Sequence, residues 1–259
     1  ILCKVISHMV EIPMFDATAE NTTILLPIAN NLQLSNECIN HLINHSPCKI
    51  IVLYDFHDES DYIQNDKVKY VKNQDAKGLV RIWNKCINIC PTEYVVLTGW
   101  RSRPTEEDFI KMFDKLNEGF GMVALKSLHF FAFSKHLLTK VGFFDTGFTT
   151  GQMEDTDFFN RCYLENIGIY VSDEIHEVSY QSTWLANPNP NIIYYKNKWR
   201  EEPPNLIMLK LEENYNDRDI YSGLYSDRKY KSFGESELFC PSVNNYFKNI
   251  FTSYIKLYN

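Results

Sequence analysis

The chain has 259 residues, of which 44% are hydrophobic and 14% aromatic, enough for a sizeable core in one large domain. Its net charge of −7 excludes nucleic-acid binding driven by a basic surface. No apolar run approaches the length of a membrane-spanning helix and no leader peptide is evident, so the sequence predicts a cytoplasmic protein. The seven cysteines lack the paired short spacings of a zinc site and are predicted to be reduced core residues.

Predicted strands and helices alternate along the chain. Short apolar runs predict strands at residues 22–28, 49–54, 68–71, 93–97, 120–125, 129–133, 169–171 and 174–180. Helical spacing predicts helices from an N-cap at Ser35 to about residue 44, over 78–89, from the capping box of Thr105 and Asp108 to about residue 116, over 135–141, and from Glu154 onward. The alternation predicts an α/β fold with a mixed, mostly parallel sheet flanked by helices. Ligands bind such sheets beyond the carboxyl ends of the strands, which brings Asn30, Asp55 and the loop 98–103 to one crevice.

Residues 142–161 hold the densest set of candidate functional side chains in the sequence. A turn that begins Gly-Phe-Phe-Asp leads to three carboxylates, Glu154, Asp155 and Asp157. Glu154 and Asp155 are predicted in the first turn of a helix, where the helix dipole favours anions. Asp157 and Arg161 are four residues apart and are predicted to pair. The alternative is that these carboxylates are only the N-terminal charges of a helix.

The order of these segments resembles the A-type fold (GT-A) of nucleotide-sugar-dependent glycosyltransferases, in particular the large inverting family with a single Rossmann-like domain. Four segments carry the resemblance: the strand 24–28 with Pro27, the strand ending in Asp55, residues 78–97, and residues 141–161. A weaker fifth piece comprises His176, Ser182-Thr183-Trp184 and Lys198-Trp199. The division expected is an N-terminal arm at 1–20, a GT-A domain at 21–202 and a C-terminal extension at 203–259. That extension suits an arm packed on the domain, an acceptor-side lid or a homodimer contact.

The resemblance implies a catalytic base, which we carry over to Asp155 first and Glu154 second. The base would deprotonate an acceptor hydroxyl on a glycan or glycoconjugate, which attacks the anomeric carbon opposite the leaving nucleoside diphosphate. The implied donor is a UDP- or GDP-linked sugar. Pro27, Asn30 and Asp55 match donor-binding positions, and Asp55 would contact the base or ribose; its alternative is a solvated loop acid.

The sequence departs from the family where the fourth predicted strand ends. The family places Asp-X-Asp there to bind a divalent metal, but residues 98–103 read Thr-Gly-Trp-Arg-Ser-Arg, which argues against bound Mn²⁺ or Mg²⁺. In one interpretation Arg101 and Arg103 replace the metal at the diphosphate, helped by other basic residues, namely Lys77, Arg81 and His176. In the other, the arginines are surface charges of a degenerate site and His176 is structural. Trp100 and Trp184 are candidates for sugar stacking, with burial in the core as their alternative.

The resemblance, together with the departure at residues 98–103, therefore implies an inverting, metal-independent glycosyltransferase. The alternative is a non-catalytic glycan-binding or scaffold domain that kept the fold. Nucleotidyl transfer would require a Gly-rich phosphate loop and a metal-binding Asp pair, and the sequence contains neither.

Overall fold

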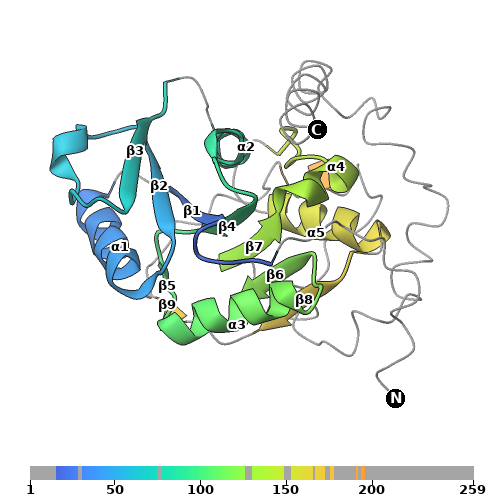
Figure 1. Cartoon of the computed structure of the whole chain (residues 1–259). Helices are drawn as coiled ribbons and strands as arrows, with labels where there is room; N and C mark the ends of the chain where they lie inside the picture. Colours follow the sequence, from blue (N-terminus) through green and yellow to red (C-terminus); the bar gives the residue numbers. More distant parts are fainter. Residues whose placement is uncertain are drawn as a thin grey trace.

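A seven-stranded sheet forms the centre of the computed structural model, with strand order β3-β2-β1-β4-β7-β6-β8 (Figure 1). The strands are β1 (Thr22–Pro27), β2 (Lys49–Tyr54), β3 (Val68–Lys72), β4 (Tyr94–Thr98), β6 (Met122–Leu125), β7 (Phe130–Ser134) and β8 (Ile169–Ser172). The structure describes residues 16–28, 31–74, 78–125, 130–148, 153–165, 167–172, 176–177, 191 and 194–195.

Most strand pairs in this sheet are parallel. β1 pairs in parallel with both β2 and β4, and the same holds for β2 with β3 and for β6 with β8. β7 runs antiparallel to both of its neighbours, β4 and β6. Only residues 126–129 separate β6 from β7, too short for the crossover that a parallel pair requires. The predicted mixed, mostly parallel sheet is confirmed.

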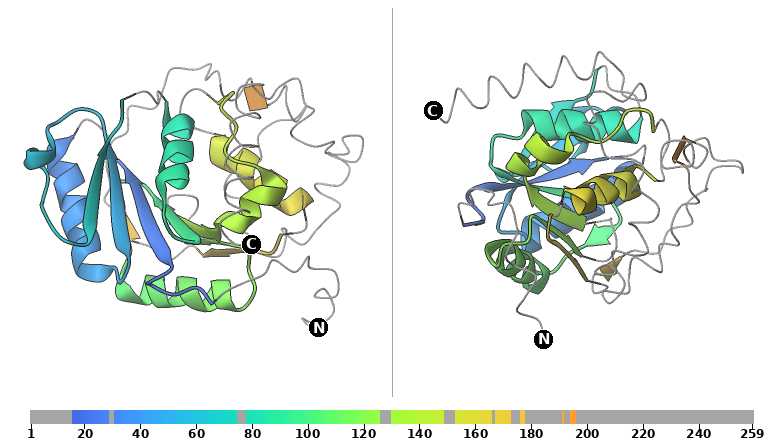
Figure 2. Two further views of the ribbon diagram at one scale, coloured as in Figure 1. Left: turned by 45° about the horizontal axis from the view of Figure 1, so that its top comes forward. Right: turned by 90° about the vertical axis from the view of Figure 1, so that its right-hand side faces the viewer.

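Helices cover both faces of the sheet. The first face carries α1 (Leu32–His45) and α3 (Glu106–Asn117), and the second carries α2 (Leu79–Ile89), α4 (Leu138–Val141) and α5 (Glu154–Leu164). Figure 2 shows α2 and α3 on opposite sides of the sheet. Because side chains alternate along a strand, Ile24 and Leu26 enter the core under α1 and α3, while Leu25 enters the core under α2 and α5.

Two predictions about local structure were wrong. The helix expected to begin at Ser35 starts at Leu32, because the side chain of Asn31 accepts a hydrogen bond from Leu34 N at 3.0 Å and caps it. Ser35 lies inside the helix and is buried. The region 98–103, expected to be a loop, contains the short strand β5 (Ser102–Arg103), which pairs antiparallel with β9 (His176–Glu177).

Elsewhere the described elements differ from the predicted ones by short 3-10 helices and small shifts of their ends, and of the predicted strand 174–180 only His176–Glu177 lies within the described residues. The 3-10 helix η2 (Glu59–Asp61) follows β2, and η3 (Lys135–Leu137) precedes α4. The predicted capping box of α3 is confirmed, since Thr105 and Asp108 bond each other's backbone nitrogens.

The described part of the chain begins next to the end of α3. Ala17, from the predicted arm, is buried and exchanges two hydrogen bonds with the side chain of Asn117. Residues 1–15 and the predicted extension 203–259 lie outside the described residues. Edge strand β3 carries exposed Lys69 and Lys72, which disfavour edge-to-edge pairing. Within the described ranges no helix is long and apolar enough to cross a membrane.

Candidate functional site

Three neighbouring strands end at one edge of the sheet. β2, β1 and β4 are adjacent and parallel, so their carboxyl ends lie side by side. Pro27 ends β1, Asp55 follows β2, and Gly99 to Arg101 follow β4. With strands about 4.8 Å apart, the ends of β2 and β4 are separated by about 10 Å. The sheet therefore gathers three of the predicted donor-binding segments along one short edge.

The first turn of α5 points toward this edge. β4 and β6 run in the same direction because both are antiparallel to β7, and β8 is parallel to β6. α5 is followed closely by β8, so it ends at the opposite edge, where β8 begins. With 11 residues, α5 spans about 16 Å, enough to carry its N-terminus back across the sheet.

Glu154 and Asp155 lie in the first turn of α5, as predicted. Glu154 is buried, with 3% of its surface exposed, whereas Asp155 is half-buried and accepts a hydrogen bond from Thr156 N at 2.7 Å. Met153, just before them, has φ +69°, a left-handed conformation that is costly for a residue with a side chain. Strained backbone of this kind clusters at functional sites, where the surrounding structure holds it in place.

Asp157 and Arg161 form the predicted pair, with Nε 3.0 Å from Oδ2, and both side chains are fully buried. Arg161 also donates to the carbonyl oxygens of Val141 and Phe143, at 2.8 Å for Phe143. Gly142, between them, has φ +73°, which glycine adopts at little cost. The pair therefore fixes the Gly-Phe-Phe-Asp turn against α5, and Asp157 has a structural role.

Two further polar side chains, Asn84 and Asp145, fix the same turn. Asn84 of α2 donates to the carbonyl oxygen of Phe144 at 2.8 Å and accepts from Phe144 N at 3.1 Å. The buried carboxylate of Asp145 accepts from Gly147 N at 2.9 Å and from the Tyr194 hydroxyl at 3.0 Å. Burial raises the pKa of Tyr194 and the Asp145 carboxylate raises it further, so the hydroxyl stays protonated and donates. Sequence reasoning missed these contacts, although Asn84 stands out as a polar residue on the apolar side of its helix.

The two arginines after β4 have different surroundings. Arg103 donates to the carbonyl oxygens of Trp100 at 2.9 Å and Ser102 at 3.0 Å, which shapes its own loop. The half-buried guanidinium of Arg101 has no hydrogen bond or ion pair within the described part of the chain. Trp100 packs against the core under α1 and α3. Backbone pairing of β5 with β9 brings His176 opposite Arg103.

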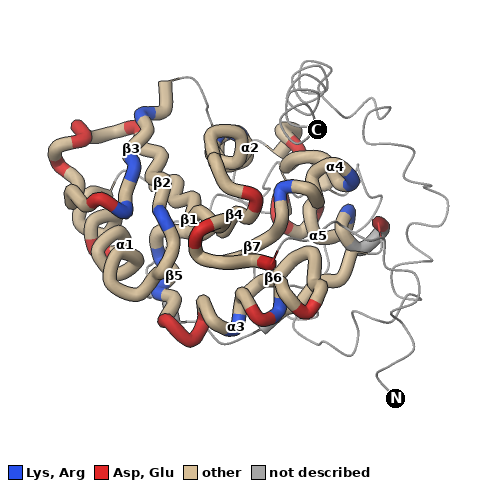
Figure 3. The backbone as a smooth tube through the Cα atoms, viewed as in Figure 1, with Lys and Arg blue, Asp and Glu red and all other residues tan. Residues whose placement is uncertain are grey.

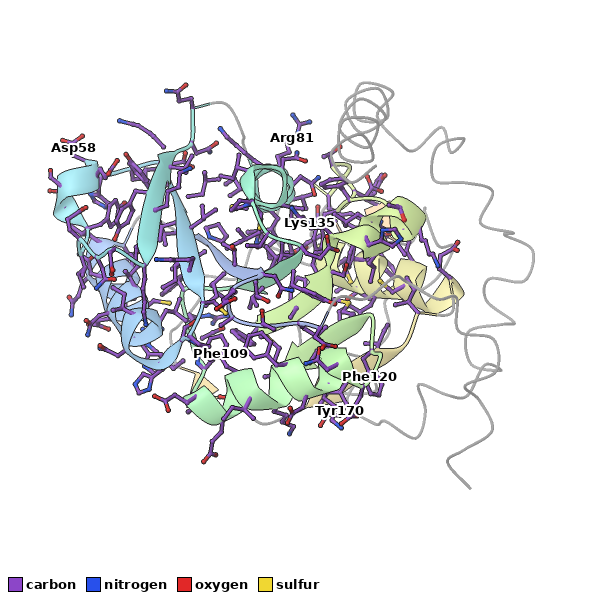
Figure 4. All side chains as sticks on the ribbon, viewed as in Figure 1. Asp58, Arg81, Phe109, Phe120, Lys135 and Tyr170 are labelled. Atoms are coloured by element: carbon purple, nitrogen blue, oxygen red, sulfur yellow. The ribbon has the colours of Figure 1, made fainter. Side chains whose placement is uncertain are left out.

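The remaining predicted site residues lie at the edge or outside the described ranges. Asp55 is half-buried, and its carboxylate has no hydrogen bond or ion pair to any described residue. Arg81 is exposed in the first turn of α2, and in Figure 4 it extends away from the sheet. Asn30, Lys77, Trp184 and the side chain of His176 lie outside what the structure describes.

The residues after β4 do not fit a divalent metal. The loop 98–103 offers no carboxylate, thiolate or imidazole, the groups that hold such ions. Within the described residues, no group of three or more His, Cys, Asp or Glu side chains could hold a metal ion. The loop carries two permanent positive charges, Arg101 and Arg103, and Arg103 hydrogen-bonds carbonyl oxygens of the loop itself.

No protein-family model and no curated protein matches the sequence. Among solved structures, the chain is similar to a mannosyltransferase from Pyrobaculum calidifontis, PcManGT, in complex with GDP-Man and Mn²⁺, with 12% identity and a TM-score of 0.54 over 75% of this chain and 69% of that one. The chain has a GT-A-like fold. It is also similar to GalNAc-T7 with UDP, GalNAc and Mn²⁺, with 9% identity and a TM-score of 0.56 over 80% of this chain. The match spans 54% of the GalNAc-T7 chain. At these identities the GT-A likeness concerns the fold alone.

Proposed function

We propose that the chain is an inverting glycosyltransferase that moves a sugar from a nucleotide-sugar donor to a hydroxyl of a glycan or glycoconjugate, without a bound metal. One observation carries the proposal: the topology directs Asp155 from α5 toward the sheet edge where Arg101 follows β4. A half-buried carboxylate is a suitable general base, and a guanidinium is a suitable partner for phosphate oxygens. The GT-A-like fold supports a nucleotide-sugar as the substrate.

The charges along the edge favour one orientation of the bound donor. Four carboxylates lie in the loop and 3-10 helix after β2: Asp55, Asp58, Glu59 and Asp61. Figure 3 shows this acidic end of the molecule in red. A diphosphate would be repelled there and attracted by Arg101 after β4. The diphosphate is therefore assigned to the end of β4, and the nucleoside to the end of β2.

The proposed step has two bond changes and one proton transfer. Asp155 takes the proton of the acceptor hydroxyl, whose oxygen attacks the anomeric carbon. The bond from that carbon to the diphosphate oxygen breaks, and its electron pair leaves with the diphosphate, whose charge Arg101 stabilises. Attack opposite the leaving group inverts the configuration. Asp157 is excluded as the base because Arg161 engages it, and the deeper burial of Glu154 leaves it second to Asp155.

Release of UDP or GDP from a panel of nucleotide-sugars, measured in EDTA with and without glycan acceptors, tests the proposal. Asp155→Asn should lower turnover by about 100-fold or more while donor binding is retained. Glu107→Gln provides a matched control, because Glu107 is an exposed acid in the first turn of α3. Turnover that Asp155→Asn leaves unchanged would remove Asp155 as the base.

The second candidate is a non-catalytic glycan-binding or scaffold domain. The carboxylate-free loop after β4 favours it, since the loop has lost the metal-binding motif of the resembled family. Such a domain would bind a glycan but no nucleotide-sugar. The cytoplasmic location and a dimer contact through residues 203–259 stay predictions alongside either function.

A further inference from the structure

We infer that Phe56 is an aromatic platform on which the nucleobase of the donor stacks, an inference that rests on the proposed function. Phe56 follows Asp55 at the carboxyl end of β2, with 58% of its surface exposed. Within the described residues only one other large hydrophobic side chain is exposed, Ile110 on α3 at 60%. Among the described residues, the other Phe, Tyr and Trp side chains are buried or half-buried, so an exposed ring beside a candidate site is exceptional.

The segment that carries Phe56 is anchored. The ring of His57 packs edge-on against Tyr62 with centroids 6.2 Å apart, and Tyr62 is itself buried. Asp58 N donates to Asp61 Oδ2 at 3.1 Å, and Asp61 N donates to the Asp58 carbonyl oxygen at 3.0 Å. The segment that follows Phe56 is thus fixed while the Phe56 ring is exposed, so less backbone has to be ordered when a ligand binds.

Unsatisfied polar atoms flank this ring. The Asp55 carboxylate has no hydrogen bond to the described residues, and His57 Nε2 is buried without a hydrogen-bond partner. Buried polar atoms without partners are costly and are commonly completed by a ligand or water. A stacking surface next to a free carboxylate matches a nucleobase, which has a flat face and N–H donors at its edge.

The negative charge around Phe56 favours a neutral nucleobase there over the diphosphate of the donor. Asp58, Glu59 and Asp61 are exposed around Phe56 and disfavour the diphosphate there, while a neutral base stacks without needing a positive partner. The ends of β2 and β4 are about 10 Å apart, so base and diphosphate would occupy opposite ends of the edge.

Titration calorimetry with UDP, GDP and inorganic pyrophosphate, in EDTA, tests this assignment. Phe56→Ala should weaken the better-bound nucleoside diphosphate about tenfold or more, with pyrophosphate affinity unchanged. Phe56→Tyr keeps a stacking ring and should retain wild-type affinity. Ile110→Ala, the matched loss of an exposed apolar side chain on α3, should change neither affinity.

The outcomes separate this inference from the proposed function. Nucleoside diphosphate binding that is equal in wild type and Phe56→Ala overturns the platform and leaves the glycosyltransferase proposal standing. Equal losses for nucleoside diphosphate and pyrophosphate also overturn it, because the ring would then act on the diphosphate or the fold. A wild-type protein that binds no nucleotide overturns both.

Discussion

At the scale of single residues, the buried pair of Asp157 and Arg161 is the part of α5 where we expect a substitution to cost the most stability. Removing one partner leaves an uncompensated charge in the core, so Asp157→Asn should lower the free energy of unfolding by about 3–5 kcal/mol. Lys115 and Glu118 form a comparable pair at 2.7 Å on the surface of α3, with side-chain exposures of 26% and 52%. There Glu118→Gln should cost far less, because water screens the exposed pair. Urea denaturation of both variants measures the difference, and equal costs would contradict the assigned role of Asp157.

His41 gives a second prediction at this scale, on pH. Burial lowers the pKa of His41 below its ordinary value, and electrostatic repulsion from His45 and Arg103 lowers it further, while its hydrogen bond to the Pro104 carbonyl oxygen opposes this. The unfolded chain therefore binds more protons at this group, and its contribution is complete above about pH 6.5 and lost as pH falls below that value. His41→Gln keeps an N–H donor but cannot titrate.

The wild-type protein should therefore lose more stability than His41→Gln between pH 7.5 and pH 5.5. Urea midpoints across that range, with the same buffer ions, measure the two slopes. Parallel slopes would show that His41 does not contribute to the pH dependence of folding.

At the scale of elements, α2 and the turn before α5 are joined by a side chain that bridges two backbone groups. Asn84→Ala leaves the N–H and carbonyl of Phe144 without their partner in the core and should cost about 2 kcal/mol or more. Asn36 offers a matched control, since it bridges the Asp61 carbonyl oxygen at 3.0 Å and Ile63 N at 3.1 Å in a more exposed place. Water can replace that bridge, so Asn36→Ala should cost clearly less. Equal losses in chemical denaturation would argue against Asn84 as an anchor of the turn.

Local patterns predicted much of the fold at this scale. The apolar run Lys49–Tyr54 became β2 with the predicted bounds, and the capping box of α3 formed as expected. The start of α1 was misplaced because Ser35, a residue type common at N-caps, occupies a buried position inside the helix, after Leu32 has already packed against the core. Strands of two residues, as in β5 and β9, carry no periodic signal at all.

Contacts between distant segments could not be predicted from the sequence. Asn84 and Phe144 are 60 positions apart, and Asp145 and Tyr194 are 49 apart, so neither pair leaves a local pattern. The same limit applies to the different surroundings of Arg101 and Arg103. Both positions hold the same residue type, and only the folded loop engages Arg103 with carbonyl oxygens of the loop.

At the scale of the whole molecule, the sheet arranges opposite charges along one edge. Carboxylates follow β2, Arg101 follows β4, and the first turn of α5 brings Asp155 toward the same edge. A donor bound along this edge would stabilise the folded state by mass action, by about 2.7 kcal/mol at a concentration 100-fold above its Kd. For a chain of this size, that corresponds to a rise in Tm of about 5–10 °C.

Thermal unfolding against a panel of UDP- and GDP-linked sugars, each with EDTA and with Mn²⁺, tests whether a nucleotide-sugar binds along this edge without a metal. At least one donor should raise Tm in EDTA, Mn²⁺ should add little, and Arg101→Ala should remove the rise. A rise that requires Mn²⁺ would contradict metal-independent binding by Arg101. No rise with any donor would contradict the glycosyltransferase itself and favour the scaffold.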